Sequence, residues 1–240
     1  MAERPAQPAG AVGTAVEELE RLALDELRPG EALPSEGELA RTLSISRLTV
    51  REAVRSLEAR GLVELRKGRR PTVREPNGSL AGDYFRIAVR RDPSALFELT
   101  EVRLALEVRN AALAATNAPR SAIAAMAGAI DAMRRAEDED GFHDADVRFH
   151  EALAAATGNG MLTQLIEQLA EPLRTSRRHS HRGRLREGRP FDEVVEAHRA
   201  ILYAVERRDP QAAAHAMETH LRMTERDLRA ALEPLEETDA

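Results

Sequence analysis

Four side chains that can bind a metal ion occur at spacings that suit a single site. Asp146 and His150 are four residues apart in HDADVRFHE, so on a helix they share one face, with Cβ atoms about 5–6 Å apart. His198, in EVVEAHRAIL, and His220, in METHLRM, each lie in a segment with helical apolar spacing. Three imidazoles and a carboxylate suit a divalent zinc, nickel, manganese or iron ion. On spacing alone, isolated core or surface histidines are the more common outcome.

A second group of residues has the chemistry to bind DNA. Between Arg41 and Arg74 the chain has ten basic and three acidic residues, although its net charge is −6. Such a basic stretch is typical of a phosphate contact, and on charge alone a solvated surface fits equally well. In SRLTVRE, Arg47 and Arg51 are four residues apart and point the same way on a helix. Arginine is the usual partner of guanine O6 and N7, so both are expected to meet base edges rather than merely solvate a helix.

The other predicted DNA contacts surround these two arginines. Thr49 suits a base edge or a phosphate, and free N–H groups at a helix start near Ser35 suit a phosphate. Arginines nearby suit the DNA backbone, and a lysine in a turn suits the adjacent minor groove. The full predicted set is Ser35, Arg41, Ser46, Arg47, Thr49, Arg51, Lys67, Gly68, Arg69 and Arg70.

Local patterns predict the elements that present the DNA-binding residues. Leucine spacing predicts a helix over 12–27. Ser35 and Glu38 have the spacing of a capping box, Ser46 can cap a third helix, and Gly61 suits the left-handed position after it. LVELR and TVRE alternate as strands do, on either side of the turn KGRRP. Three helices and a hairpin make a winged helix-turn-helix, whose second motif helix enters the major groove.

The rest of the chain is predicted to be helical. Six helices are expected over roughly 94–116, 120–139, 142–157, 161–179, 190–207 and 210–233, with Pro and Gly at the breaks. Several are apolar around much of their circumference and should pack as a bundle. We therefore expect a mainly α protein, with a winged helix-turn-helix followed by an all-α bundle of six or seven helices. The expected parts are a disordered tail over 1–11, the winged domain over 12–75, a linker over 76–92, the helical domain over 93–233 and a tail over 234–240.

Composition excludes several classes of protein. The chain has no cysteine, which excludes disulfides, thiolate zinc sites and cysteine nucleophiles. No run of 18 apolar residues predicts a membrane-spanning helix, and the first residues lack the apolar segment of a signal peptide. We therefore expect a cytoplasmic protein with no membrane partner.

The stretch LPSEGELARTLSISRLTVREAVRSLEARGLVE resembles the DNA-binding domain of the GntR family of bacterial transcription regulators. The matching pieces are Leu-Pro-Ser-Glu, the Ser-Arg pair at 46–47, Val-Arg-Glu-Ala at 50–53, and Leu57 with Gly61-Leu62-Val63. Two positions depart from the pattern. Gly37 stands where relatives often have Arg, and the wing reads Gly68-Arg69-Arg70-Pro71 where relatives often have Gly-Arg-Gly. The departure at Gly37 affects an expected phosphate contact, and the departure at residues 68–71 affects the expected contact of the wing with DNA.

Residues 93–233 resemble the FadR-type effector-binding domain, FCD, that follows this DNA-binding domain in many GntR regulators. The resemblance rests on EVRLALEVRNAALAA, on Asp146-x-x-Phe149-His150, on ATGN at 156–159 and on the surroundings of the two later histidines. It implies that Asp146, His150, His198 and His220 hold a metal ion whose open positions accept a carboxylate of a small organic acid effector.

Two further effector-binding residues are expected. The resemblance implies that Arg103 pairs with the effector carboxylate; the alternative is an ordinary exposed arginine with Glu107 one turn later. Asn159 lines the pocket or only caps the helix that begins there, and the cap is slightly favoured. The other histidines are assigned to the surface or to loops, and the basic stretch 174–189 to a solvated loop. They are His143, His179, His181 and His215.

The sequence as a whole predicts a ligand-responsive transcription regulator. It would be a homodimer through its helical domain, because a symmetric operator in double-stranded DNA needs two recognition helices. We expect the protein to repress transcription and the effector to relieve that repression. A metal-dependent hydrolase is one alternative, but no general base stands beside the ligands, since Glu151 points off the face that His150 shares with Asp146. A pure metal sensor is another.

Overall fold

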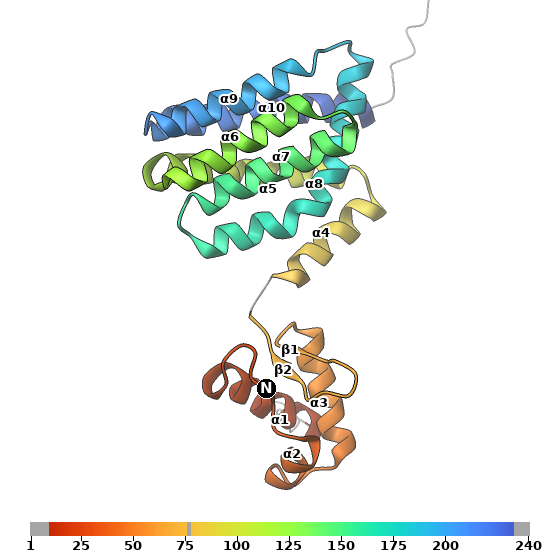
Figure 1. Cartoon of the computed structure of the whole chain (residues 1–240). Helices are drawn as coiled ribbons and strands as arrows, with labels where there is room; N and C mark the ends of the chain where they lie inside the picture. The colour runs from red at the N-terminus through yellow and green to blue at the C-terminus, as the bar shows by residue number, and fades with distance from the viewer. Residues whose placement is uncertain (1–9, 76–77, 233–240) are drawn as a thin grey trace, which may run out of the picture. The chain divides into compact units, whose positions relative to one another are not determined.

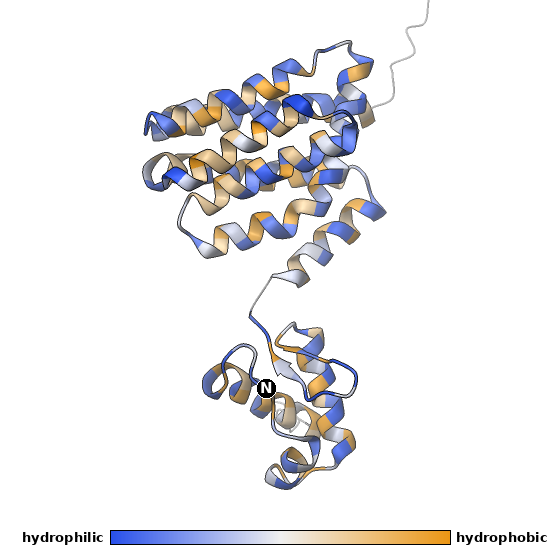
Figure 2. Ribbon diagram, in the orientation of Figure 1, coloured by the Kyte–Doolittle hydropathy of each residue, from blue (hydrophilic) through white to orange (hydrophobic). Residues whose placement is uncertain are grey.

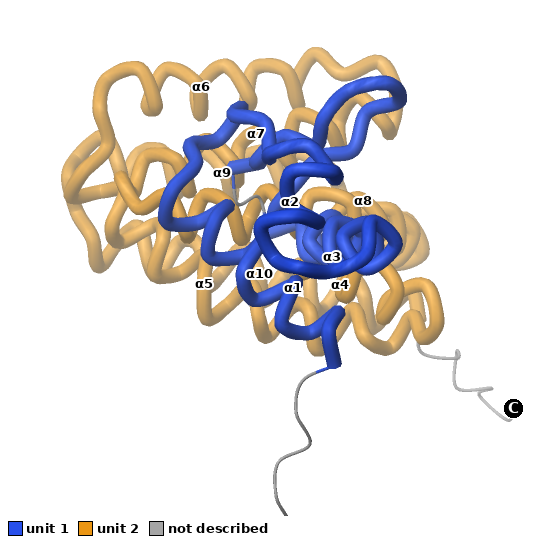
Figure 3. Tube along the Cα trace, turned by 90° about the horizontal axis from the view of Figure 1, so that it is seen from below, with its two compact units in different colours: residues 1–80 blue, residues 81–240 orange. Residues whose placement is uncertain are grey.

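The computed structural model describes residues 10–75 and 78–232. It divides into two compact units, residues 1–80 and residues 81–240, which Figure 3 shows in different colours. Of the tail expected over 1–11, residues 1–9 lie outside the described residues, as does the tail expected over 234–240, while residue 11 already begins a helix.

The first unit has the predicted order of three helices and a hairpin (Figure 1). Its elements are α1 (Ala11–Arg21), the π-helical turn η1 (Leu22–Glu26), α2 (Glu36–Thr42), α3 (Arg47–Ala59), β1 (Val63–Glu64) and β2 (Thr72–Val73). The helix predicted over 12–27 is therefore α1 with η1. Its core consists of aliphatic side chains from every element, among them Leu19, Leu39, Leu57 and Val63, all buried.

Side-chain caps fix where α2 and α3 begin. Ser35 Oγ accepts from the Glu38 backbone N–H at 3.3 Å, and a Glu38 carboxylate oxygen accepts from the Ser35 N–H at 2.8 Å. Ser46 Oγ accepts from the Thr49 N–H at 3.0 Å. Gly61, at φ +74°, follows α3 in the left-handed conformation. The capping box, the second cap and the terminating glycine that the sequence predicts are all confirmed.

The wing is a short antiparallel hairpin. Val63 pairs with Val73 and Glu64 with Thr72, so each strand has two residues, fewer than the sequence predicts. Thr72 also bridges to Ala32, which ties the segment before α2 to the hairpin. The turn between the strands contains Gly68 at φ +75°, a conformation that suits glycine.

The second unit is entirely helical within the described residues. Its helices are α4 (Ser79–Arg91), α5 (Ala95–Asn117), α6 (Arg120–Arg135), α7 (Glu139–Ala155), α8 (Gly160–Arg186), α9 (Asp192–Glu206) and α10 (Pro210–Leu232). Seven helices agree with the predicted bundle. The stretch 76–92, expected to be a linker, contains α4. The fourth helix of the bundle is predicted to end at residue 179, whereas α8 continues to Arg186. The stretch 174–189, expected to be a solvated loop, is therefore mostly helical.

The bundle is built around α10, which packs against α5, α8 and α9, while α6 packs against α7. Figure 2 shows apolar residues concentrated on the helix faces that meet neighbours. The core includes Phe149, Leu153, Ile201 and Met217. Polar and charged residues are buried beside it, and they form the site described below. None of the helices in the described part of the chain is long and apolar enough to span a membrane.

Candidate functional site

The start of α3 presents Arg47 and Arg51 on an exposed surface. The Arg47 guanidinium lies over Gly37 of α2, where a Cβ atom would come 3.4 Å from Arg47 Nη2. The absence of a side chain at position 37 therefore leaves room for Arg47. Arg51 Nε donates to a Glu36 carboxylate oxygen at 2.7 Å, an exposed ion pair of the kind that contributes little to stability. Both arginines remain available to an anionic partner.

The other predicted DNA-binding residues lie in a surface hollow, at the cap of α3 and in the wing. A surface hollow is lined by residues of α2 and the start of α3, including Ser35, Arg41 and Arg47. Hydrogen bonds from Ser35, with smaller effects of Arg70 and Arg41, lower the pKa of Glu38, so Arg70 acts on the α2 start. The Thr49 and Ser46 hydroxyls lie 2.9 Å apart within the cap. Lys67, Gly68 and Arg69 are exposed in the wing turn.

The four predicted metal ligands meet inside the helical unit. Asp146 and His150 come from α7, His198 from α9 and His220 from α10, and each is buried. One ligand atom from each lies within 4.8 Å of the other three. The i, i+4 spacing puts the first two on one helical face, and packing of α9 and α10 against the bundle supplies the rest.

Partners outside this group orient two of the imidazoles. His198 Nδ1 donates to the Val194 carbonyl at 2.7 Å, which leaves His198 Nε2 as the acceptor, 3.2 Å from Asp146 Oδ1. His150 Nδ1 contacts the Glu107 carboxylate, so its Nε2 faces the centre of the group. Metal-binding histidines commonly give their second ring nitrogen to a carbonyl or carboxylate in this way.

The electrostatics of the group fit a divalent ion. Burial, followed by the neighbouring His150, lowers the pKa of His198 well below its usual range, and burial followed by His198 does the same for the pKa of His220. Neutral imidazole is the form that binds metals. His150 Nε2, His198 Nε2 and His220 Nδ1 are buried without a hydrogen-bond partner among the described residues. These orphan acceptors and the Asp146 carboxylate are the donor set that would hold the ion.

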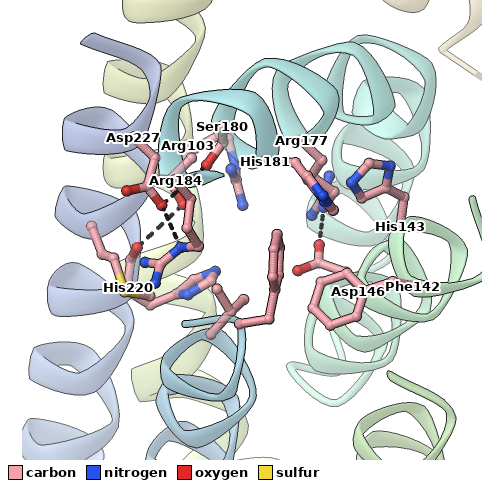
Figure 4. Close-up of a pocket in the computed structure, with 14 residues that line it drawn as sticks. Arg103, Phe142, His143, Asp146, Arg177, Ser180, His181, Arg184, His220 and Asp227 are labelled. Atoms are coloured by element: carbon pink, nitrogen blue, oxygen red, sulfur yellow. Dashed lines mark hydrogen bonds and ion pairs between the residues drawn. The ribbon is translucent and has the colours of Figure 1, made fainter. Parts of the chain in front are cut away.

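A cavity adjoins this group, and buried charged side chains line it (Figure 4). Three buried arginines each pair with a buried carboxylate: Arg103 Nε with Glu107 at 2.6 Å, Arg184 Nε with Asp227 at 3.0 Å, and Arg177 with Asp146. Arg189 also contacts Asp227 at 2.6 Å and Glu193 also contacts Arg184 at 2.9 Å, so arginines and carboxylates remain equal in number. Guanidinium nitrogens of all three arginines remain buried without a hydrogen-bond partner among the described residues. The cavity thus offers free donors that suit an anionic ligand.

The cavity corrects two expectations from the sequence. Arg103 does pair with Glu107, but the pair is buried rather than exposed, and its Arg103 side lines the cavity. The basic stretch 174–189 is not a solvated loop, because Arg177 and Arg184 point inward from α8. The pKa of Glu107, which burial raises, is held below its usual range by Arg103 and His150.

The remaining predicted residues have separate positions. Asn159 caps α8, where its side-chain oxygen accepts from the N–H groups of Met161 and Leu162 at 3.0 and 3.3 Å, and it does not line the cavity. His215 is exposed, as expected. His143 is buried and His181 half-buried on the cavity wall, so their assignment to the surface is wrong.

Sequence reasoning missed the inward-facing roles of Glu107, Arg177, Arg184 and Asp227. A usable pattern was present on α8. Ile166, Leu169 and Leu173 are buried at helical spacing, and Arg177 and Arg184 continue the same stripe. A charged residue on an otherwise apolar stripe indicates a buried, paired charge.

Comparisons with known proteins agree with this architecture. Residues 12–73 match the family described as bacterial regulatory proteins, gntR family, and residues 98–223 match the FCD domain. The Uxu operon transcriptional regulator of Escherichia coli (strain K12) is 35% identical, over 92% of this chain and 85% of that protein. The HTH-type transcriptional repressor NanR of Citrobacter rodentium (strain ICC168) is 32% identical, over 85% of this chain and 80% of that protein.

A solved structure shows the same fold. Streptococcus agalactiae GntR superposes with a TM-score of 0.68 at 28% identity, covering 90% of this chain and 99% of that one. The two family matches account for both units, and the relatives are named as regulators of transcription. The hydrolase alternative is thereby excluded. The chain belongs to the gntR family of bacterial transcription regulators, with a winged helix-turn-helix followed by an FCD domain, and it is not an enzyme.

Proposed function

We propose that the protein is a metal-containing repressor whose operator binding is relieved by a small carboxylate. The proposal rests on the charged side chains beside the four-ligand group. Three buried arginines are each paired with a buried carboxylate there, so their charges cancel. A divalent ion adds two positive charges to this group of buried ion pairs, in which arginines and carboxylates are equal in number. Buried uncompensated charge is costly, so an anion that enters with or after the ion is favoured.

The chain's own residues supply the recognition of that anion. When bound, the ion supplies open coordination positions that a carboxylate oxygen can occupy. Arg177 is paired with Asp146, which is also a proposed ligand, so an ion on Asp146 frees the Arg177 guanidinium. Arg103 and Arg177 then offer fork-shaped donors to the anion on the same side as the ion.

The family and the symmetry of operator DNA support the direction of regulation and the assembly that we propose. The relative NanR is named a repressor, which favours repression here. Two recognition helices are needed for a two-fold symmetric operator, so we expect a homodimer through the helical unit, working in the cytoplasm where the DNA is. The effector acts by binding the DNA-competent and incompetent arrangements with different affinity.

DNA binding is tested with an operator selected from a random-sequence duplex library by the wild-type protein. In fluorescence anisotropy, Arg47→Ala and Arg51→Ala should each weaken operator binding by about tenfold or more, because a bidentate arginine–base pair contributes about 1–3 kcal/mol. Arg60→Ala, at the far end of the same helix and paired with Glu20, is the matched control and should bind like wild type. Equal losses in all three variants would contradict the assignment of α3 as the reading helix.

The effector site is tested by adding a panel of small mono-, di- and hydroxycarboxylates to the metal-loaded protein on its operator. A member of the panel should release DNA from wild type, and Arg103→Ala should bind the operator normally but fail to respond. Release by metal alone, with no effect of any carboxylate, would support the pure metal sensor instead.

A further inference from the structure

A second group of metal-binding side chains lies near the start of α7. Glu139 and His143 are one turn apart on α7, and His181 faces them from α8. One ligand atom from each of the three lies within 4.8 Å of the other two. His143 Nε2 is 3.8 Å and His181 Nδ1 is 3.9 Å from the same Glu139 oxygen. Two imidazoles and a carboxylate thus converge on one point.

The two imidazoles are at least partly buried, and each has a ring nitrogen that forms no hydrogen bond with the described residues. His143 is 3% exposed, and burial lowers its pKa to about 4, so its ring is neutral at pH 7. His143 Nδ1 and His181 Nδ1 are buried atoms with no hydrogen-bond partner among the described residues. Orphan polar atoms of this kind require an explanation, and an ion provides one for His181 Nδ1 directly.

Aromatic packing holds the histidine rings in place. The His181 ring lies 4.1 Å from the Phe191 ring, measured between centroids, and Phe142 meets the edge of the neighbouring His143 ring. The carboxylate of Glu139, by contrast, is exposed. A fixed pair of imidazoles with one solvent-facing carboxylate resembles a three-ligand site whose other positions take water.

We propose that Glu139, His143 and His181 form a second site for a divalent transition-metal ion, on the wall of the same cavity and open to solvent through Glu139. The ligand set, two imidazoles and one carboxylate, suits zinc or a similar ion. With three protein ligands instead of four, and with Arg177 and Arg178 nearby, this site binds more weakly than the group around His198. It does not depend on an effector or on DNA binding.

The test counts zinc ions per chain on the full-length protein by calorimetric titration, with cobalt absorption as a second readout of imidazole ligation. Wild type should bind two zinc equivalents, one tight and one weaker. Glu139→Gln and His181→Asn should each lose the weaker equivalent only. His198→Asn should lose the tight one and keep the weaker. A thermal melt of each metal-free variant confirms that it is folded.

His215→Asn is the matched control, because His215 is an exposed histidine on α10 outside both groups. It should retain two equivalents. One equivalent in wild type would overturn the second site, as would retention of both equivalents by Glu139→Gln and His181→Asn.

Discussion

At the scale of single residues, Ser44 occupies a backbone conformation that serine adopts at a cost. It follows α2 with φ +55°. The Ile45 N–H donates to the Ala40 carbonyl at 3.0 Å and the Ser44 N–H to the Arg41 carbonyl at 3.3 Å, the two bonds of a Schellman motif. We expect Ser44→Gly to stabilise the winged unit by about 0.5–1 kcal/mol, because glycine takes positive φ without a Cβ penalty. Chemical denaturation measures the change.

Ser44→Ala separates the backbone effect from the loss of the hydroxyl. Alanine keeps the Cβ atom and removes only the oxygen, so its stability should stay near wild type. A glycine variant no more stable than the alanine variant would mean that the turn carries no strain.

The same scale shows what the sequence can reveal about a site. Asp146 and His150 were predictable because i, i+4 spacing fixes their common face locally. The partner of Arg177 was not predictable, because Asp146 lies 31 residues away and only the packing of α7 against α8 brings the two together. Helical periodicity shows which residues lie on the same face of one helix. Whether a charge on that face can be buried depends on its partner on the neighbouring helix.

At the scale of elements, α8 and α10 cross at Gly183 with no room for a side chain. A Cβ atom at this position would lie 1.8 Å from the Asp227 carbonyl oxygen and 2.9 Å from the Ala231 nitrogen. Both are backbone atoms, so one helix would have to move. We expect Gly183→Ala to lower the free energy of unfolding of the helical unit by about 1–3 kcal/mol or more, as overpacking does. Thermal unfolding followed by circular dichroism measures it.

Gly128→Ala is the control for that substitution. Gly128 also lies inside a helix, α6, and a Cβ atom there meets nothing within 4 Å. Alanine should therefore stabilise by about 0.5–1 kcal/mol through helix propensity alone. If both alanines shifted stability in the same direction, steric contact at the crossing would not be the cause.

The predicted helix boundaries agree with the structure where a local cap determines them, and differ from it at the end of α8. The α2 and α3 starts depend on side chains within three residues, so Ser35 and Ser46 marked them correctly. The basic run after residue 174 lacks the apolar periodicity of a helix, yet α8 continues because Arg177 and Arg184 find buried carboxylates. Long-range pairing there replaced the apolar stripe that a sequence pattern detects.

At the scale of the whole molecule, the two units should respond separately to the loss of metal. Four buried ligand groups stabilise the folded helical unit only when an ion holds them, by about 2.7 kcal/mol when free ion is about 100 times the dissociation constant. In differential scanning calorimetry a chelator should lower the melting temperature of the helical unit and leave the winged unit unchanged. His198→Ala should lose most of this shift and keep only the smaller one that comes from the weaker site at Glu139, His143 and His181. A shift as large as that of wild type in this variant would place the tightly bound ion elsewhere.

The sharing of Asp146 between Arg177 and the proposed ion has a consequence for how the regulator reads its surroundings. Since metal and anion each relieve the charge that the other introduces, each must raise the affinity of the other by the same factor. The protein would then act as a coincidence detector, answering to a carboxylate only as strongly as the supply of free metal permits. Cells short of metal would keep the operator occupied at effector concentrations that clear it in metal-replete cells.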